Sequence, residues 1–210
     1  SADDSSTGTK VAIKKMNYPF IQPATAQRAF REFVLLSSVN HPAVRYSAVS
    51  YDLRYVSHFS DHSYILCVHS SSRCEQLQRY VHGDGIMYMV TEFVYQLLCA
   101  VNHLHREGII HRDLKPCNIA VNENYVLKVL DFGLARLFNP SVAEKMTSYV
   151  VTRYYRAPEI DLKLKYTEKV DVWSIGCIFA EIVTGDVLFP GRHDQQINTI
   201  FQIMGTPSAD

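Results

Sequence analysis

Two short segments of this sequence hold the residue types that chemistry on a phosphate requires. Asp113 lies in the string HRDLKPCN (111–118), and Asp131 opens the string DFG (131–133). Phosphoryl transfer depends on positioning and charge neutralisation more than on covalent catalysis. Asp113 is suited to orient a hydroxyl proton, and Lys115 to reach a transferring phosphoryl group. Asn118 and Asp131 offer the hard oxygen ligands that Mg²⁺ prefers.

Two further strings flank these segments in a fixed order. VAIK (11–14) stands near the start of the chain, and APE (157–159) follows the string DFG. Each string alone recurs by chance. Four of them in this order, with strands and helices expected between them, make chance a poor explanation.

The four strings in this order resemble the eukaryotic protein kinase family. The resemblance implies an α+β, bilobal kinase-like fold, with residues 1–70 as a partial N-lobe and 71–210 as a C-lobe without its last helices. It implies ATP and Mg²⁺ as cofactors, and Asp113, Lys115 and Asn118 as catalytic residues. It also implies that Asp171 caps the backbone of the catalytic loop from a buried helix.

The resemblance assigns the nucleotide site as well. Lys14 would hold the α- and β-phosphates, and Glu32 on the following helix would be its ion-pair partner, with Glu75 as the alternative. An exposed surface role for Glu32 also stays open. The positions expected to sandwich or hydrogen-bond the adenine are Ala12, Ala120 and a hinge placed by spacing after a buried strand, at Cys67, Val68, His69 and Ser70.

The elements that must position these residues follow from apolar periodicity. Strands are expected at 10–15, 63–68, 119–122 and 126–130. An amphipathic helix is expected at 25–38, with Thr25 as its N-cap and with the apolar positions Ala26, Ala29, Phe30, Phe33, Val34 and Leu36. A second is expected at 88–106, with Val94, Leu97, Leu98, Val101 and Leu104 on one face. Short helices are expected at 72–82 and 194–204. Residues 169–184 are apolar almost all round, which predicts a fully buried helix. The connection 131–168 shows little regular pattern.

The segment before APE resembles the dual-phosphorylation lip of the mitogen-activated protein kinases. It contains Thr147-Ser148-Tyr149, followed by VVTRYYRAPE, and LFPGR stands at 188–192. These strings are most like the Jun N-terminal kinase group, which usually has proline where Ser148 stands here. The resemblance implies phosphorylation of Thr147 and Tyr149 and a preference for proline after the target Ser or Thr.

Phosphates on this lip would need guanidinium partners. The expected partners of a phosphate on Thr147 are Arg28, Arg31, Arg112 and Arg136. Those of a phosphate on Tyr149 are Arg153 and Arg156. Ordinary surface charges are the alternative for Arg28 and Arg31. Cys117, inside the catalytic loop, is either a reactive thiolate or an inert thiol.

Composition excludes several other classes. Lys and Arg together number 21 and are balanced by 21 Asp and Glu, so no nucleic-acid or polybasic membrane surface is expected. The five cysteines are odd in number and form no CxxC pair, which favours reduced thiols in an intracellular protein. The resemblance to the kinase group implies a location in the cytoplasm and nucleus. As a kinase of this group, a monomer would meet protein substrates such as transcription factors, an upstream dual-specificity kinase, and phosphatases.

The glycine-rich loop that precedes VAIK in the family is missing, because Gly8 is the only glycine before Lys14. The first residue is not methionine. Three hypotheses follow: a fragment of an active kinase, a catalytically impaired pseudokinase that acts as a binding partner, and a truncated product that folds poorly.

Overall fold

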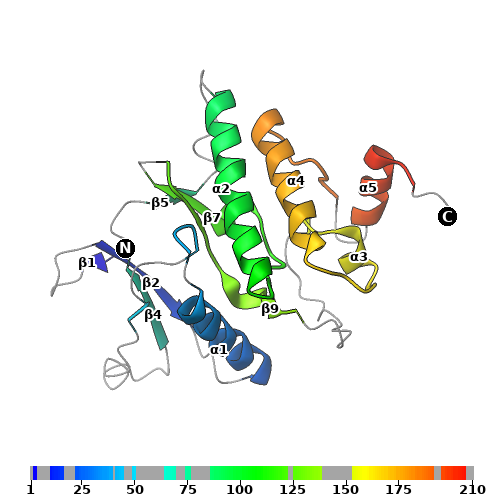
Figure 1. Cartoon of the computed structure of the whole chain (residues 1–210). Helices are drawn as coiled ribbons and strands as arrows, with labels where there is room; N and C mark the ends of the chain where they lie inside the picture. Colours follow the sequence, from blue (N-terminus) through cyan, green and yellow to red (C-terminus); the bar gives the residue numbers. More distant parts are fainter. Residues whose placement is uncertain are drawn as a thin grey trace.

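The computed structural model describes residues 2–3, 10–16, 22–39, 41–44, 49–50, 64–69, 74–76, 86–122, 125–138, 153–191 and 195–206. Figure 1 shows a small sheet and one helix, α1, at the N-terminal end of the molecule, with helices α2, α4 and α5 following toward the C-terminal end. Small sheets together with separate helices confirm the predicted α+β class.

The N-terminal sheet is antiparallel and has the strand order β1-β2-β4-β3. In its centre Ala12 pairs with Val68 and Lys14 with Leu66. The two central strands agree with the predictions to within one residue at each end. The strands are β1 (Ala2–Asp3), β2 (Lys10–Met16), β3 (Val49–Ser50) and β4 (Tyr64–His69).

The predicted adenine hinge is misplaced relative to this sheet. Cys67, Val68 and His69 lie inside β4 instead of after a strand, and Ser70 lies outside the described residues. The strand reaches His69 because that residue still pairs with Val11 on β2.

Two smaller sheets carry the segments on either side of the catalytic loop. The first has the order β5-β7-β8, and the second joins β6 to β9. Their bounds are β5 (Cys74–Gln76), β6 (Ile109–Ile110), β7 (Ile119–Asn122), β8 (Leu127–Val129) and β9 (Arg136–Leu137). The helix predicted over 72–82 is wrong at 74–76, where Gln76 pairs with Ala120. Tertiary pairing here overrides a weak helical pattern.

Helix α1 (Pro23–Ser38) begins two residues before the predicted start. Its N-cap is Gln22 and not Thr25, whose hydroxyl lies inside the helix and donates to the Gln22 carbonyl at 2.8 Å. Proline at the first helical position explains the earlier start, because a fixed φ suits that position and the missing N–H costs nothing there.

The apolar face predicted for this helix is only partly buried. Leu35 and Leu36 are in the core, whereas Phe30 is 67% exposed and Val34 41% exposed. The helix packs on the 3-10 turn η4 (Phe132–Leu134), which covers part of its circumference.

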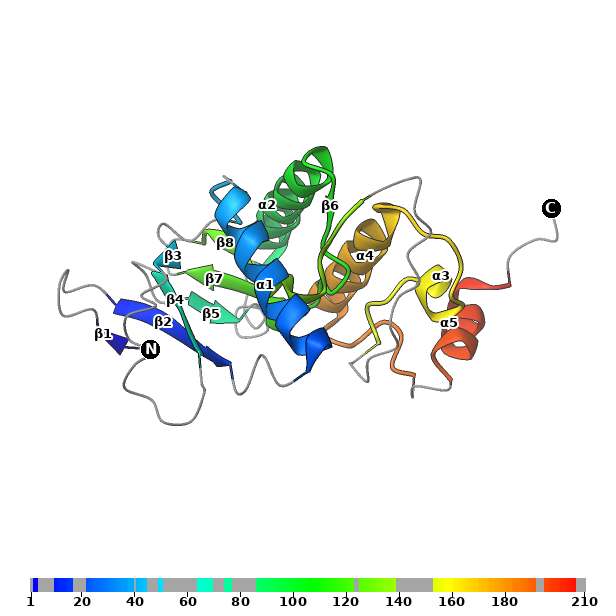
Figure 2. The ribbon, with the colours of Figure 1, turned by 90° about the horizontal axis from the view of Figure 1, so that it is seen from below.

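Helices α2 (Ile86–Arg106) and α4 (Lys169–Thr184) lie side by side in both views and form the centre of the core (Figures 1 and 2). Leu97, Val101 and Leu104 are buried as predicted, but Leu98 faces outward. Past the end of α2, Gly108 takes φ 71°, a left-handed conformation that side chains other than glycine rarely adopt.

The prediction that residues 169–184 form a fully buried helix is wrong for one face of α4. Ile175, Ile178 and Ile182 are buried, but Val172, Phe179 and Val183 are exposed. Among the described residues, α4 is covered on the side of α2 and on the side of the segment that contains the APE string. The apolar composition therefore predicts burial correctly except on the face that carries the three exposed residues.

The connection 131–168 is more ordered than its sequence predicts. Besides η4 and β9 it contains α3 (Pro158–Asp161), and residues 139–152 lie outside the described part. Helix α5 (Gln196–Met204) comes last and contacts α3. None of the helices in the described ranges has the length and apolarity needed to cross a bilayer.

Burial along α4 leads to a first prediction, on the substitution of Ile178 by alanine. Ile178 of α4 is fully buried in the main hydrophobic core, so we expect Ile178→Ala to lower the free energy of unfolding by about 2–5 kcal/mol. Val183 lies on the exposed side of the same helix, and Val183→Ala should change stability by less than about 0.5 kcal/mol. Urea unfolding measures both. Equal losses of unfolding free energy in the two variants would contradict the difference in burial between the faces of α4 that carry Ile178 and Val183.

Candidate active site

A buried carboxylate from α4 fixes the backbone of the catalytic loop. Asp171 accepts hydrogen bonds from the backbone N–H groups of His111 and Arg112, both at 2.8 Å, and it contacts His105 Nε2 at 2.8 Å. A fully buried carboxylate is stable only when its oxygens are bonded in this way. Arg112 takes φ 66°, which a residue other than glycine rarely adopts without support. The predicted capping role of Asp171 is confirmed.

The three predicted catalytic side chains meet within this loop. Lys115 Nζ donates to Asp113 Oδ2 at 2.9 Å, and Asn118 Nδ2 donates to the same oxygen at 3.1 Å. Asn118 Nδ2 also donates to the Asp113 carbonyl at 2.8 Å, which closes the loop on itself. All three side chains are largely buried, so the charge of Asp113 is held by a cation and an amide in a site sheltered from water.

The turn that carries Asp131 is tied to the same loop. Asp131 takes φ 58° and its Oδ1 accepts from Gly133 N at 3.2 Å. One residue earlier, Leu130 N donates to the Asn118 carbonyl at 2.8 Å, and His111 Nε2 lies 3.0 Å from the Leu130 carbonyl. The backbone thus brings the neighbourhoods of Asn118 and Asp131 together.

Asn118 and Asp131 offer one amide oxygen and one carboxylate. This small set of ligands suits Mg²⁺ better than it suits a metal that takes all its ligands from the protein. Within the described ranges, no group of three or more His, Cys, Asp or Glu side chains is arranged to hold an ion. Mg²⁺ usually takes one or two carboxylates and fills its remaining positions with water and substrate phosphate oxygens.

The Arg28 side chain of helix α1 lies directly over Gly133. A β-carbon on Gly133 would clash with the Arg28 guanidinium, so a larger residue here would displace that side chain. Arg28 Nη2 lies 3.7 Å from Asp131 Oδ1, which places this predicted phosphate ligand beside the predicted metal ligand. Glu32, one turn further, is 3% exposed, so its interpretation as an exposed helix residue is wrong. Arg31 is half-buried on the same helix.

Several predicted nucleotide positions are described only in part. The side chains of Ala12 and Lys14 lie outside what the structure describes, so the Lys14–Glu32 ion pair stays a prediction. Ala120 is buried in β7.

Two of the arginines predicted to bind a lip phosphate contact the segment after Asp131. Arg112 Nε donates to the Leu134 carbonyl at 2.9 Å, and its Nη1 donates to the hydroxyl of Tyr166. Arg136 Nη1 donates to the Ala135 carbonyl at 2.9 Å. Thr147 and Tyr149 themselves lie outside the described residues.

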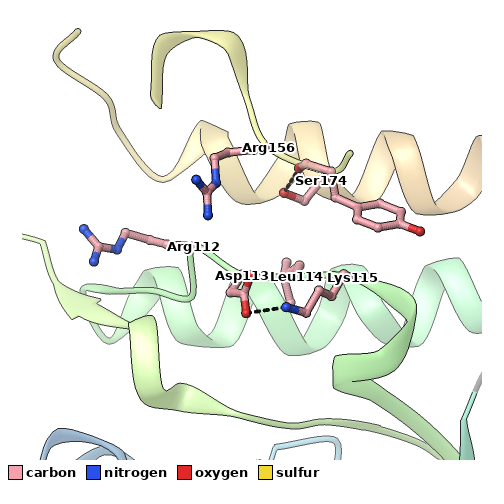
Figure 3. A pocket seen from close by; sticks show the side chains of 7 residues that line it. Arg112, Asp113, Leu114, Lys115, Arg156 and Ser174 are labelled. Atoms are coloured by element: carbon pink, nitrogen blue, oxygen red, sulfur yellow. Dashed lines mark hydrogen bonds and ion pairs between the residues drawn. The ribbon is translucent and has the colours of Figure 1, made fainter. Parts of the chain in front are cut away.

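A small pocket opens where the catalytic loop faces α4 and the two residues just before the APE string (Figure 3). In Figure 3 the Asp113–Lys115 pair forms one wall, and Arg156 points into the space from the opposite wall. The opposite wall is held from α4, because Ser174 Oγ donates to the Tyr155 carbonyl at 2.6 Å. The lining residues are Arg112, Asp113, Leu114, Lys115, Tyr155, Arg156 and Ser174.

Behind this wall, sequence reasoning missed two interactions. Tyr155 donates its hydroxyl to Glu181 Oε2 at 2.6 Å, and burial, followed by that contact, raises the pKa of Tyr155. Asp161 Oδ1 lies 3.2 Å from Arg153 Nη1 and 3.9 Å from Arg156 Nη1. The only signal in the sequence was an acidic residue shortly after two arginines. The two arginines predicted to receive a phosphate on Tyr149 therefore already share a carboxylate.

The geometry of the site and the similarity of the chain to known proteins indicate the same family. A capped catalytic loop, an Asp–Lys–Asn cluster and a tied Asp-Phe-Gly turn are the parts that phosphoryl transfer on this fold uses. A family profile described as a protein kinase domain matches residues 1–208. The chain belongs to the protein kinase family, whose members in general use ATP and a divalent metal.

Within that family, the chain is similar to stress-activated kinases. It is 46% identical to GLH-binding kinase 1 of Caenorhabditis elegans, over 98% of this chain and 53% of that protein. It is 45% identical to the stress-activated protein kinase JNK of Drosophila melanogaster, over 99% of this chain and 55% of that protein. It is 44% identical to the stress-activated protein kinase JNK of Suberites domuncula, over 99% of this chain and 56% of that protein. The chain spans about half the length of these relatives.

The cap on the catalytic loop provides a second prediction. Asp171→Ala removes the acceptor of two buried N–H groups, and hydrogen bonds to a charged group contribute about 1.5–3 kcal/mol each. We expect faster hydrogen exchange at the amides of His111 and Arg112 and a lower unfolding temperature. Asp186→Ala, at an exposed position after α4, is the matched control. Unchanged exchange at both amides would contradict the cap.

The thiols provide a third prediction. Burial is the largest influence on both, raising the pKa of Cys117 above its usual value and that of Cys177 to about 12. A raised pKa leaves less thiolate at a given pH, so both should alkylate more slowly than free cysteine at pH 8. Cys177 is also buried and should react only on unfolding. Mass spectrometry of iodoacetamide-labelled protein tests this, and rapid labelling of Cys117 would support a reactive thiolate instead.

Proposed function

We propose that this protein is a serine/threonine kinase of the mitogen-activated type, which transfers the γ-phosphoryl group of ATP to Ser or Thr followed by proline. The observation that carries the proposal is the Asp113 carboxylate, held at 2.9 Å by Lys115 and at 3.1 Å by Asn118. A carboxylate in that position is suited to orient a hydroxyl, and the lysine beside it to neutralise a phosphoryl group.

The chain's own residues divide the work of this reaction. Asp113 would receive or direct the proton of the acceptor hydroxyl, while Lys115 would stabilise charge on the transferring group. Asn118 and Asp131 would hold Mg²⁺, which neutralises the phosphates when it is bound. Lys14, supported by Glu32, would anchor the α- and β-phosphates. The strands that carry Ala12 and Ala120 would enclose the adenine.

The pocket beside Asp113 is the proposed seat of the acceptor residue. It is lined by Asp113 and Lys115 on one side and by Tyr155 and Arg156 on the other, so an acceptor hydroxyl entering it would meet the proposed base. The wall formed by Tyr155 would receive the residue that follows the acceptor.

Regulation and partners are proposed from the similarity to the stress-activated kinases. Phosphates on Thr147 and Tyr149, added by an upstream dual-specificity kinase and removed by phosphatases, would engage the arginines around the catalytic loop. Substrates would be proteins such as transcription factors, met by a monomer in the cytoplasm and nucleus.

A fourth prediction tests this function directly. Mg²⁺-ATP should raise the unfolding temperature of the protein, and Asp113→Asn should keep that shift while lowering phosphate transfer by about 10²–10⁴-fold. The control is Asp186→Asn, which lies outside the pocket and should transfer normally. Radiolabelled transfer to a Ser-Pro peptide supplies the rate.

The outcomes separate the rival interpretations. Equal transfer by the Asp113→Asn variant would refute the role given to this carboxylate. A thermal shift with Mg²⁺-ATP but no transfer by the unsubstituted protein would favour an impaired kinase that acts by binding. The absence of any shift would contradict nucleotide binding by this chain.

A further inference from the structure

Asp161 shares one carboxylate oxygen between two arginines at the back of the acceptor pocket. Its Oδ1 lies 3.2 Å from Arg153 Nη1 and 3.9 Å from Arg156 Nη1. The side chain of Asp161 is 4% exposed, that of Arg153 13% and that of Arg156 8%. Charges this deeply buried interact strongly, because little water screens them.

Arg156 belongs to this cluster and to the pocket at the same time. Its guanidinium points into the pocket whose other wall carries Asp113 (Figure 3). Burial lowers the pKa of Arg156, and Asp161 is the strongest influence that opposes this, followed among the acidic groups by Asp113. Arg153 and Arg112 act on it as repelling cations. Arg156 is therefore placed between two carboxylates, one behind the pocket and one inside it.

We propose that Asp161 is a positioning residue that holds Arg156 at the back wall of the pocket and so keeps it from pairing with Asp113. The proposal rests on the function proposed above, in which Asp113 must stay available to the acceptor hydroxyl. Without Asp161, Arg153 and Arg156 would repel each other with no shared anion between them. Arg156 would then turn toward Asp113, where it would compete with Lys115 and with the acceptor.

The segment that carries Arg153 and Arg156 has anchors that do not involve the Asp161 carboxylate. Ser174 Oγ donates to the Tyr155 carbonyl, and the Tyr155 hydroxyl donates to Glu181. Arg156 N donates to the Arg153 carbonyl at 2.9 Å, which closes the turn before the APE string. These anchors remain when Asp161 is replaced, so the effect of the replacement should fall on the arginine side chains.

The test compares Asp161→Ala with the double variant Asp161→Ala/Arg156→Gln and with Asp186→Asn as the matched surface control. We expect Asp161→Ala to lower kcat/KM for a Ser-Pro peptide by about 10–10²-fold, since a small misplacement of catalytic groups has effects of this size. The double variant should regain at least about threefold, because it lacks the guanidinium that captures Asp113. Formate, but not formamide, should also restore part of the rate of Asp161→Ala, by filling the vacated anion position.

A merely structural role for Asp161 predicts different results. The double variant would then be no faster than Asp161→Ala, and formate would have no effect; either pattern, or a rate for Asp161→Ala equal to that of Asp186→Asn, overturns the proposal. Thermal melts of all variants, run alongside, identify any that fail to fold. If Asp161→Ala does not fold, Asp161→Asn takes its place, with Asp161→Asn/Arg156→Gln as its double variant and the same expected rates; the formate test is then left out, because asparagine fills the position that formate would occupy.

A second measurement distinguishes failure of this inference from failure of the proposed function. The Nε–H signal of Arg156 is followed by NMR in the Asp161→Ala protein, with and without Asp113→Asn. We expect the signal to move when Asp113 is neutralised in the Asp161→Ala background, and to stay in place when Asp161 is present. This readout needs no turnover. A signal insensitive to Asp113 in both backgrounds refutes the inference, whereas an unsubstituted protein without phosphate transfer refutes only the proposed function.

Discussion

The bond between the Asp171 carboxylate and the backbone of the catalytic loop is the constraint on which the rest of the site depends. It places a charge from the first turn of α4 against two N–H groups that have no strand or helix partner. With the loop held there, Arg112 can keep its left-handed backbone, and Asp113 follows at a set position. The helical core thus transmits its rigidity to the reacting groups through a single fully buried side chain.

Three buried carboxylates around that anchor are each compensated by a different kind of partner. Asp113 is shared by a lysine and an amide, Asp161 by two arginines, and Asp171 by backbone and a histidine. Each carboxylate has different partners, and burial makes those partners decisive, because a charge removed from water must find its compensation locally. The site therefore contains neighbouring clusters of charged groups, and each carboxylate stays with its own partners because the backbone holds it there.

The resemblance of one string to the kinase catalytic loop predicted the catalytic trio, and Asp113, Lys115 and Asn118 meet because they lie close together in one short loop. Most helices and strands followed from periodicity, and their bounds differed by one or two residues. Contacts that depend on tertiary packing were missed. The strand at 74–76 exists through its pairing with β7, and the exposed face of α4 reflects which neighbours cover it. The Asp161 cluster needed a turn and a short helix whose relative placement no local pattern encodes.

The contact between helix α1 and the Asp-Phe-Gly turn gives the molecule a mechanical link. The Arg28 side chain of α1 lies over Gly133, in the space that a β-carbon at this position would occupy, and its guanidinium also lies beside Asp131. Any rolling or sliding of α1 would therefore move this arginine relative to Asp131 and the turn. A residue larger than glycine at position 133 would displace the Arg28 side chain before it displaced the helix, so glycine here keeps the arginine seated on the turn.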